Sequence, residues 1–121
     1  MSTAQRSTPE GKVAAALIKA VKARGGFIRK LRWENRVGAP DYLIAIRGYV
    51  YFVETKAPGE KVRPAQAAEF RKLKDAKKSV LVLDRAELAE TLVEILTGPC
   101  VAAGSGDTYA CLGDFLYEAH L

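Results

Sequence analysis

A chain of 121 residues is long enough for one domain and too short for two of ordinary size. With 49% hydrophobic and 27% charged residues, its composition is that of a globular protein and excludes an intrinsically disordered chain. Residues 1–78 hold 18 Lys and Arg against 7 Asp and Glu, whereas residues 79–121 hold 1 against 7. The basic first part favours an extended polyanion as partner, above all nucleic acid; a merely solvated basic surface is the alternative.

The sequence also bears on the cellular compartment. Residues 1–8 are polar and lack the apolar core of a secretory signal, and no apolar run approaches the ~20 residues of a membrane-spanning helix. Cys100 and Cys111 are the only cysteines, and we expect them to be free thiols. These features predict a soluble, cytoplasmic protein without a membrane partner.

The first predicted element is a helix over residues 9–24. Thr8 can serve as its N-cap, and Pro9 suits the first helical position because its missing N–H has no partner to lose there. Apolar residues at helical spacing form the stripe expected to face the core; they are Val13, Ala14, Leu17, Ala20 and Val21. Glu10 lies three and four residues before the start of this stripe, so the same spacing places a carboxylate on the inward side of the helix.

Three strands are predicted next. Alternating side chains indicate a strand over residues 27–33. Trp33 is interpreted as a core residue, with stacking on a base as the alternative. A loop follows over residues 35–40. Two β-rich runs over residues 41–46 and 49–55 are then separated by only two residues, which predicts a hairpin.

The second half contains a helix, a strand and a further helix. A loop over residues 57–63 precedes a helix over 64–76, and a short apolar strand follows over 79–83. Asp84 is expected to cap a last helix that ends before Gly98. The helix between the third and fourth strands allows a crossover to a parallel strand. The predicted fold class is therefore α/β, with a mixed central sheet flanked by helices on both faces.

The hairpin determines which side chains oppose one another. If its turn centres on Arg47 and Gly48, Asp41 lies opposite Glu54, with Cβ atoms about 4.5–5.5 Å apart on one face. Lys56 emerges on the same face because it follows Glu54 by two residues. The other positions on this face are apolar, and we expect them to be buried; they are Leu43, Ala45, Val50 and Phe52.

Two facing carboxylates and an ammonium group at the end of a buried face suggest a metal site. Asp41 and Glu54 repel each other, and each is costly to desolvate unless it is paired. A divalent cation such as Mg²⁺ resolves this conflict, since it binds one or two carboxylates and leaves positions for water and phosphate oxygens. Lys56 can then hold the attacking water and neutralise charge that develops on phosphorus. The alternative is a salt-bridge cluster at a sheet edge.

The residues around this pair extend the pattern to a family motif. The motif comprises Gly38-Ala39-Pro40-Asp41, then after twelve residues Glu54-Thr55-Lys56, and then Gln66 at the start of the next helix. It resembles the PD-(D/E)XK nuclease superfamily, and within it the VRR-NUC branch, the virus-type replication-repair nuclease domain. The resemblance covers residues 8–83. It implies a restriction-endonuclease-like αβββαβ core, which agrees with the predicted element order.

The resemblance further implies a catalytic centre that uses Mg²⁺ or Mn²⁺. The metal ligands would be Asp41, Glu54 and the backbone carbonyl of Thr55, while Lys56 would orient the hydrolytic water. No organic cofactor is expected, because the sequence contains no Gly-rich phosphate loop of the GK[ST] type.

Two more polar residues correspond to positions of the family site. Glu10 would match the first-helix carboxylate of related nucleases and act as a further metal ligand. Gln66 would lie near the metal or a phosphate of the cleaved strand. Each has a structural alternative: Glu10 suits a helix first turn through the helix dipole, and Gln66 is an ordinary polar residue at that position.

Basic residues near the site are candidates for contacts with DNA phosphates; they are Arg29, Lys30, Arg32, Arg36, Lys61 and Arg63. Lys61 and Arg63 are the strongest candidates, because they lie in the loop directly after the strand that carries Glu54. Simple solvation is the alternative for each of them.

The predicted function is that of a structure-selective DNA endonuclease. Small members of the family that lack a separate DNA-binding module resemble Holliday-junction resolvases, and a homodimer would match the two-fold symmetry of branched DNA. A monomeric flap or nicking nuclease and a non-catalytic nucleic-acid-binding module are the alternatives. We expect a flexible N-terminus over residues 1–8, the nuclease core over 9–98, and an extension over 99–121 that packs on the core or on a dimer partner.

Overall fold

The structure is a computed structural model that describes residues 8–97. Its elements are α2 (Pro9–Ala23), β1 (Phe27–Lys30), β2 (Tyr42–Ile46), β3 (Tyr49–Thr55), α3 (Pro64–Asp75), β4 (Ser79–Leu83), the 3-10 turn η1 (Ala86–Leu88) and α4 (Ala89–Leu96). The predicted extension over 99–121, with both cysteines, lies outside the described residues, as do residues 1–7. In the part that is described, every helix is too short or too polar to cross a membrane.

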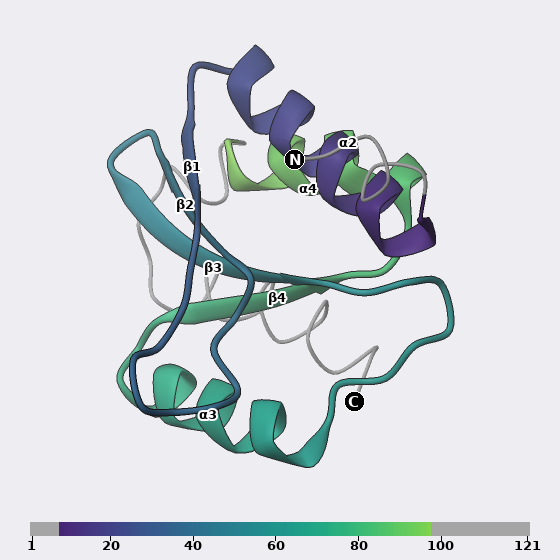
Figure 1. The fold of residues 1–121 in the computed structure, drawn as a ribbon. Coiled ribbons are helices and arrows are strands. Elements are labelled where there is room, and N and C mark those ends of the chain that lie inside the picture. The colour runs from purple at the N-terminus through teal and green to yellow at the C-terminus, as the bar shows by residue number, and fades with distance from the viewer. Residues whose placement is uncertain (1–7, 98–121) are drawn as a thin grey trace.

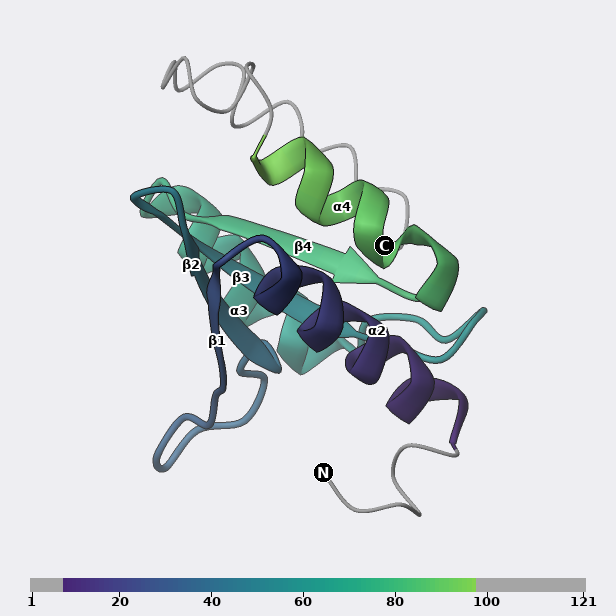
Figure 2. The same ribbon diagram turned by 90° about the horizontal axis from the view of Figure 1, so that it is seen from above.

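The described strands form one mixed sheet in the order β1-β2-β3-β4. β1, β2 and β3 are antiparallel neighbours, and β4 pairs with β3 in parallel after the crossover through α3. Helices α2 and α4 cover one face of the sheet and α3 covers the other (Figures 1 and 2). This arrangement confirms the predicted α/β class and the αβββαβ element order.

Helix α2 and the inward face of the hairpin form the main core. The Thr8 hydroxyl accepts a hydrogen bond from the Gly11 N–H at 2.9 Å, so the predicted N-cap is present. The apolar stripe of α2 is buried as expected. It packs against the inward side chains of β2 and β3 and against α4; the sheet residues are Tyr42, Ile44, Ile46, Tyr51 and Val53.

The opposite face of the hairpin is less covered than the sequence analysis predicted. Phe52 packs against the small second core around Phe70, whereas Val50 is 39% exposed. The reason is the position of α3, which follows the crossover and lies over β3 and β4, leaving part of β1 and β2 open.

Trp33 was also wrongly interpreted as a core residue. β1 ends at Lys30, and Trp33 is half-buried in the loop beyond it.

The last helix begins later than predicted. Asp84 was expected to be its N-cap, but the chain first forms the 3-10 turn η1, and α4 starts at Ala89 without a side-chain cap. Burial of its apolar face compensates, since Leu92, Val93 and Leu96 pack into the main core. Helix formation here is therefore determined mainly by tertiary contacts.

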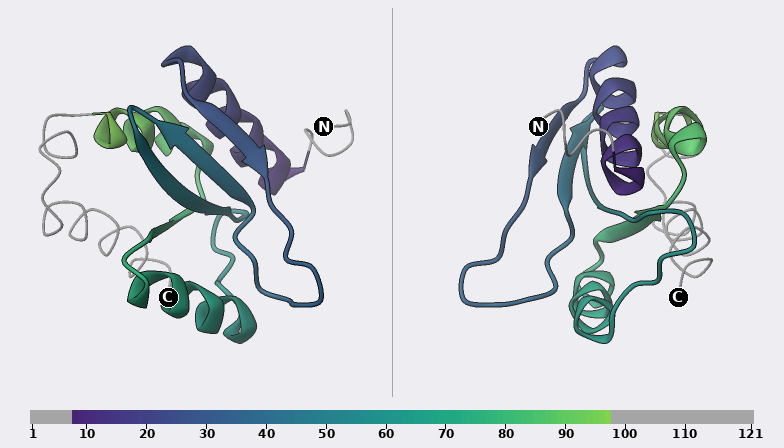
Figure 3. Two further views of the ribbon diagram at one scale, coloured as in Figure 1. Left: turned by 90° about the vertical axis from the view of Figure 1, so that its left-hand side faces the viewer. Right: turned by 45° about the vertical axis from the view of Figure 1, so that its right-hand side comes forward.

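The loop between β1 and β2 is fixed to α3. In both views of Figure 3 it extends past the ends of its two strands to the level of α3. Arg36 donates two hydrogen bonds to the Glu69 carboxylate, at 3.1 and 2.8 Å. Gly38 has a φ of +99°, and a Cβ at this position would lie 2.6 Å from the Ala65 carbonyl oxygen. Only glycine permits this approach, which brings the chain to Asp41 in a defined position.

We predict that Gly38→Ala destabilises the fold more than Gly48→Ala does. Both glycines have positive φ, so both substitutions cost about 1–2 kcal/mol of backbone strain, but a Cβ on Gly48 meets nothing within 4 Å. Overlap with the Ala65 carbonyl should add about 1–3 kcal/mol at Gly38. Urea denaturation of the two variants measures the difference; equal losses would show that the loop does not need this contact.

Candidate active site

Asp41 and Glu54 lie side by side at the ends of neighbouring strands. The observed register, with Tyr42 opposite Val53, brings Asp41 next to Glu54, and the Asp41 N–H donates to Glu54 Oε1 at 3.1 Å. Asp41 Oδ2 in turn accepts hydrogen bonds from the Thr55 N–H at 3.0 Å and from the Thr55 hydroxyl at 2.8 Å. Each carboxylate is thus oriented by the strand that carries the other.

Lys56 and Gln66 complete a buried polar network with Glu54. Lys56 Nζ lies 3.3 Å from Glu54 Oε2 and donates to Gln66 Oε1 at 2.8 Å. Gln66 Nε2 donates to the same Glu54 oxygen at 2.7 Å. Gln66 is held in place because its Oε1 also accepts the Arg63 N–H at the start of α3, at 3.0 Å. The three side chains are buried, which restricts them to this geometry.

Negative charge is in excess at this network. Burial and the Asp41 carboxylate raise the pKa of Glu54 to about 7, against the opposing effects of Lys56 and Gln66. Burial and the charges of Asp41 and Glu10 likewise raise the pKa of Tyr42. Lys56 pairs with Glu54 alone among the carboxylates of residues 8–97, so one ammonium does not balance the site. A site with these raised pKa values fits a bound cation.

A pocket of about 330 Å³ opens onto the network. Its lining residues are Glu10, Asp41, Glu54, Lys56, Glu60, Lys61, Arg63 and Gln66. A second pocket of about 110 Å³ adjoins it and shares Glu10 and Asp41. The cluster is therefore not sealed by its ion pair, and both carboxylates can be approached by a ligand.

The metal ligands expected from the sequence are not all assembled. Asp41, Glu54 and Thr55 are adjacent, and Glu10 lines both pockets together with Asp41 while it remains exposed to solvent. Across residues 8–97, no three carboxylate, histidine or cysteine side chains converge as a metal-binding group. Partial burial and the charges of Asp41 and Glu60 nevertheless raise the pKa of Glu10, so its carboxyl group experiences the same negative field.

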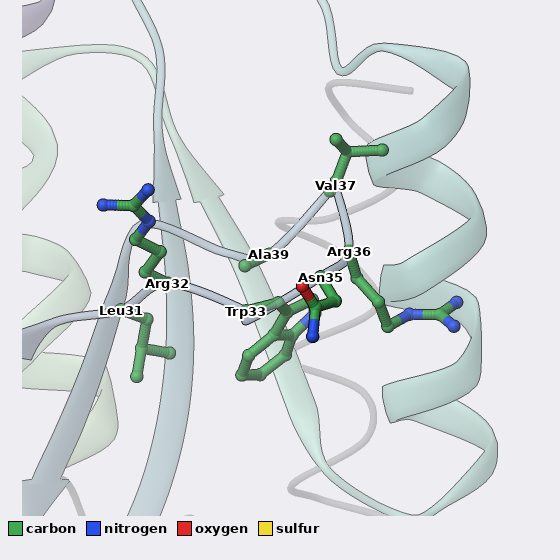
Figure 4. A pocket seen from close by; sticks show the side chains of 8 residues that line it. Leu31, Arg32, Trp33, Asn35, Arg36, Val37 and Ala39 are labelled. Atoms are coloured by element: carbon green, nitrogen blue, oxygen red, sulfur yellow. The ribbon is translucent and has the colours of Figure 1, made fainter.

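The basic residues predicted to contact phosphates fall into three groups. Lys61 and Arg63 line the larger pocket, as favoured by the sequence analysis, and Lys30 lines the smaller one. Arg32 and Arg36 line a separate hollow in the β1–β2 loop (Figure 4). Arg36 forms an ion pair with Glu69 of α3, and its guanidinium lowers the pKa of Glu69 to about 2. The remaining candidate, Arg29, packs over the Phe27 ring at 3.9 Å.

Glu60 was missed by the sequence analysis. It lines the larger pocket because the loop after β3 turns back on itself: the Glu60 N–H donates to the Ala57 carbonyl at 2.9 Å, and Glu60 Oε1 accepts from the Ala57 N–H at 3.3 Å. The Pro58-Gly59 pair is the available sequence signal, since it is typical of a tight turn.

Comparison with known proteins identifies relatives over this fold and site. No family model matches the chain. It is 38% identical over 84 residues to "Putative nuclease p44" of Acyrthosiphon pisum secondary endosymbiont phage 1, a match that covers 69% of this chain and 90% of the relative. A solved structure described as "VRR_NUC domain" superposes with a TM-score of 0.68 at 34% identity, covering 73% of this chain and 97% of that one.

Both relatives are matched over nearly their whole length, and the TM-score shows that the solved domain shares the fold of this chain. The hydrogen-bonded residues of the site are also those of the motif that first suggested the family. The chain belongs to the VRR-NUC domain family.

Proposed function

We propose that the chain is a metal-dependent DNA endonuclease that hydrolyses phosphodiester bonds and selects branched DNA. The observation that carries this proposal is the buried Glu54 carboxylate, whose pKa is raised to about 7 beside Asp41 in an accessible pocket. A fold stabilised only by packing would gain nothing from two adjacent, poorly neutralised carboxylates. A hydrolase that binds a cation requires them.

The candidate ligands for Mg²⁺ or Mn²⁺ are the Asp41 and Glu54 carboxylates and the Thr55 carbonyl. When bound, such an ion supplies charge stabilisation at the phosphate and lowers the pKa of a coordinated water. Oxygen donors suit both ions. The raised pKa of Glu54 shows why a cation would be attracted, since ionising this carboxyl group is costly without one.

Lys56 is the residue best placed to act on the attacking water or on the phosphate oxygens. Its ammonium group is held by Glu54 and Gln66 rather than free to rotate, so it presents a fixed charge and proton donor at the pocket. Preorganised donors of this kind stabilise charge that develops in a transition state. Gln66 acts as a positioning residue, because it bridges Lys56 and Glu54.

Lys61 and Arg63 give the pocket positive charges that can bind the phosphates of a DNA backbone. Both line the same pocket as the carboxylates, and both are exposed. Phosphate contacts from such residues fix the position of a strand without reading its sequence. Binding should accordingly weaken with increasing salt.

Substitution of Asp41 tests whether the site is catalytic. We expect Asp41→Asn to lower the rate of DNA cleavage on the order of 100-fold or more while leaving DNA binding nearly unchanged, because the change removes a charge but keeps the side-chain shape. Gel assays with Mg²⁺ or Mn²⁺, together with binding assays in EDTA, measure the two effects. Asp75→Asn, an exposed acid at the end of α3, is the matched control. Unchanged cleavage by Asp41→Asn would exclude this site as the catalytic centre.

Glu54 predicts a pH dependence of stability without metal. Because its folded pKa of about 7 lies above the ordinary value of 4.5, its stabilising contribution is complete below about pH 4.5 and is lost as the pH rises through 7. The loss should reach at most about 3 kcal/mol. Urea denaturation in EDTA at several pH values measures it, and Glu54→Gln should remove this part of the slope. Mg²⁺ or Mn²⁺ should restore stability at pH 8 in the wild type more than in Glu54→Gln; equal effects would contradict metal binding by Glu54.

Two further parts of the proposed function are a preference for branched DNA and a homodimeric state. A four-way junction has two-fold symmetry, and its resolution needs cuts on two strands. A C2 dimer would present two copies of the pocket with the same symmetry.

We therefore expect a labelled four-way junction to be cut at symmetric positions and faster than a flap, a duplex or a single strand of the same sequence. Light scattering should give the mass of a dimer. Equal rates on all four substrates would contradict structure selection, and a monomer that cuts flaps best would favour a flap nuclease instead.

A further inference from the structure

The hollow of the β1–β2 loop has no lining residue in common with the two pockets at the carboxylates. Its volume is about 770 Å³, and its lining residues are Leu31, Arg32, Trp33, Asn35, Arg36, Val37, Gly38 and Ala39. Figure 4 shows these side chains on the loop between the strands and α3, with Arg36 reaching toward the helix. The hollow is open and lined by both apolar and cationic groups, the two kinds of group that contact the base and the phosphate of a nucleotide.

The loop presents two large apolar side chains, Trp33 and Val37, to solvent. Trp33 is the only tryptophan of the chain, yet it belongs to neither core cluster of the described residues and stays half-buried. Val37 is 77% exposed. A large indole in a solvent-open hollow is a typical surface for stacking a planar ligand.

Contacts with α3 hold the loop in place. Arg36 is bound to Glu69, and Gly38 lies against the Ala65 carbonyl, so two points of the loop are fixed on α3. Asn35 adopts a φ of +61°, a left-handed conformation that shapes the turn between Trp33 and Arg36. A preformed hollow loses little entropy on binding.

The hollow is linked to the candidate active site through α3 and through the chain itself. Gly38 contacts Ala65, and the next residue of α3, Gln66, hydrogen bonds to Glu54 and Lys56. Two residues beyond Ala39 the same loop reaches Asp41. A DNA strand held at Asp41 in the larger pocket would therefore be bound at the end of the loop that forms the hollow, and Arg32 is exposed on that loop to contact a phosphate.

We propose that the hollow formed by residues 31–39 binds an unstacked nucleobase of single-stranded DNA, with the Trp33 indole as its stacking surface. This inference rests on the proposed function, since it takes the DNA strand in the adjacent pocket as its starting point. It identifies the feature that distinguishes branched DNA from a duplex: at a branch or an end an unpaired base leaves its stack at a lower cost than a base inside a duplex does. Stacking accepts any base, so selection would depend on DNA structure and not on sequence.

The intrinsic fluorescence of Trp33 tests the inference without any cleavage. In EDTA, a short oligothymidine strand should quench the tryptophan emission of the wild-type protein, because a stacked base contacts the indole directly. A strand of equal length and charge made of abasic sites should bind through its phosphates but leave the emission unchanged. Anisotropy of labelled strands measures binding independently.

Substitutions separate stacking from general DNA binding. Trp33→Ala should weaken binding of the oligothymidine strand about 5- to 150-fold but leave binding of the abasic strand unchanged, whereas Trp33→Phe should retain most of the affinity. Phe27→Ala, which removes an exposed aromatic residue outside the hollow, is the matched control and should leave quenching intact.

The possible failures can be told apart. Binding without quenching, or equal quenching by the abasic strand, would overturn the stacking site while leaving the nuclease proposal in place. Loss of cleavage in Asp41→Asn together with normal quenching would support both. Absence of binding to any strand in low salt would overturn both.

Discussion

The central constraint in this protein is the buried carboxylate of Glu54. It lies beside a second carboxylate, Asp41, and its only partner cation among the described residues is Lys56. The Asp41 N–H and the Gln66 side chain donate hydrogen bonds to Glu54, and Lys56 forms an ion pair with it. The pKa of Glu54 is nevertheless raised to about 7. The network therefore fixes the geometry of the acid without fully neutralising it, which is the condition that a cation-dependent site requires.

The fold meets this constraint by making β3 a central strand. β2 on one side supplies Asp41, and β4 on the other holds the chain through the hydrogen bond from the Lys56 N–H to the Leu83 carbonyl, at 2.9 Å. The first turn of α3 then places Gln66 over the end of the strand. Because the β1–β2 loop is also fixed to α3, Asp41 and Gln66 are positioned by one shared contact, and the glycine of the motif is the residue that makes this contact possible.

Local patterns in the sequence predicted the parts of the structure that depend on local rules. The two-residue turn is present, with φ of 52° at Arg47 and 85° at Gly48, and it gives the register that sets Asp41 beside Glu54. Coverage of the two sheet faces was not predictable in the same way. Alternation along a strand shows which side chains share a face, but not how far a helix such as α3 extends across it. For this reason Val50 is more exposed than the sequence suggested. Trp33 is more exposed for a different reason, because β1 ends at Lys30 and leaves it in the following loop. Glu60 reaches the pocket through a turn that periodicity does not describe.

The arrangement of basic residues also differs from what net charge alone suggests. Lys56 and Arg36 are both paired with carboxylates, Glu54 and Glu69, so each contributes to the internal structure of the domain. The other cations near the site are exposed and line its openings: Lys61 and Arg63 line the larger pocket, Lys30 the smaller one, and Arg32 the hollow of the β1–β2 loop. A nucleic-acid strand that reaches more than one of these openings would meet an exposed cation at each of them. The basic residues therefore have two roles: the paired cations belong to the internal structure of the domain, and the exposed ones can contact the phosphates of a nucleic acid.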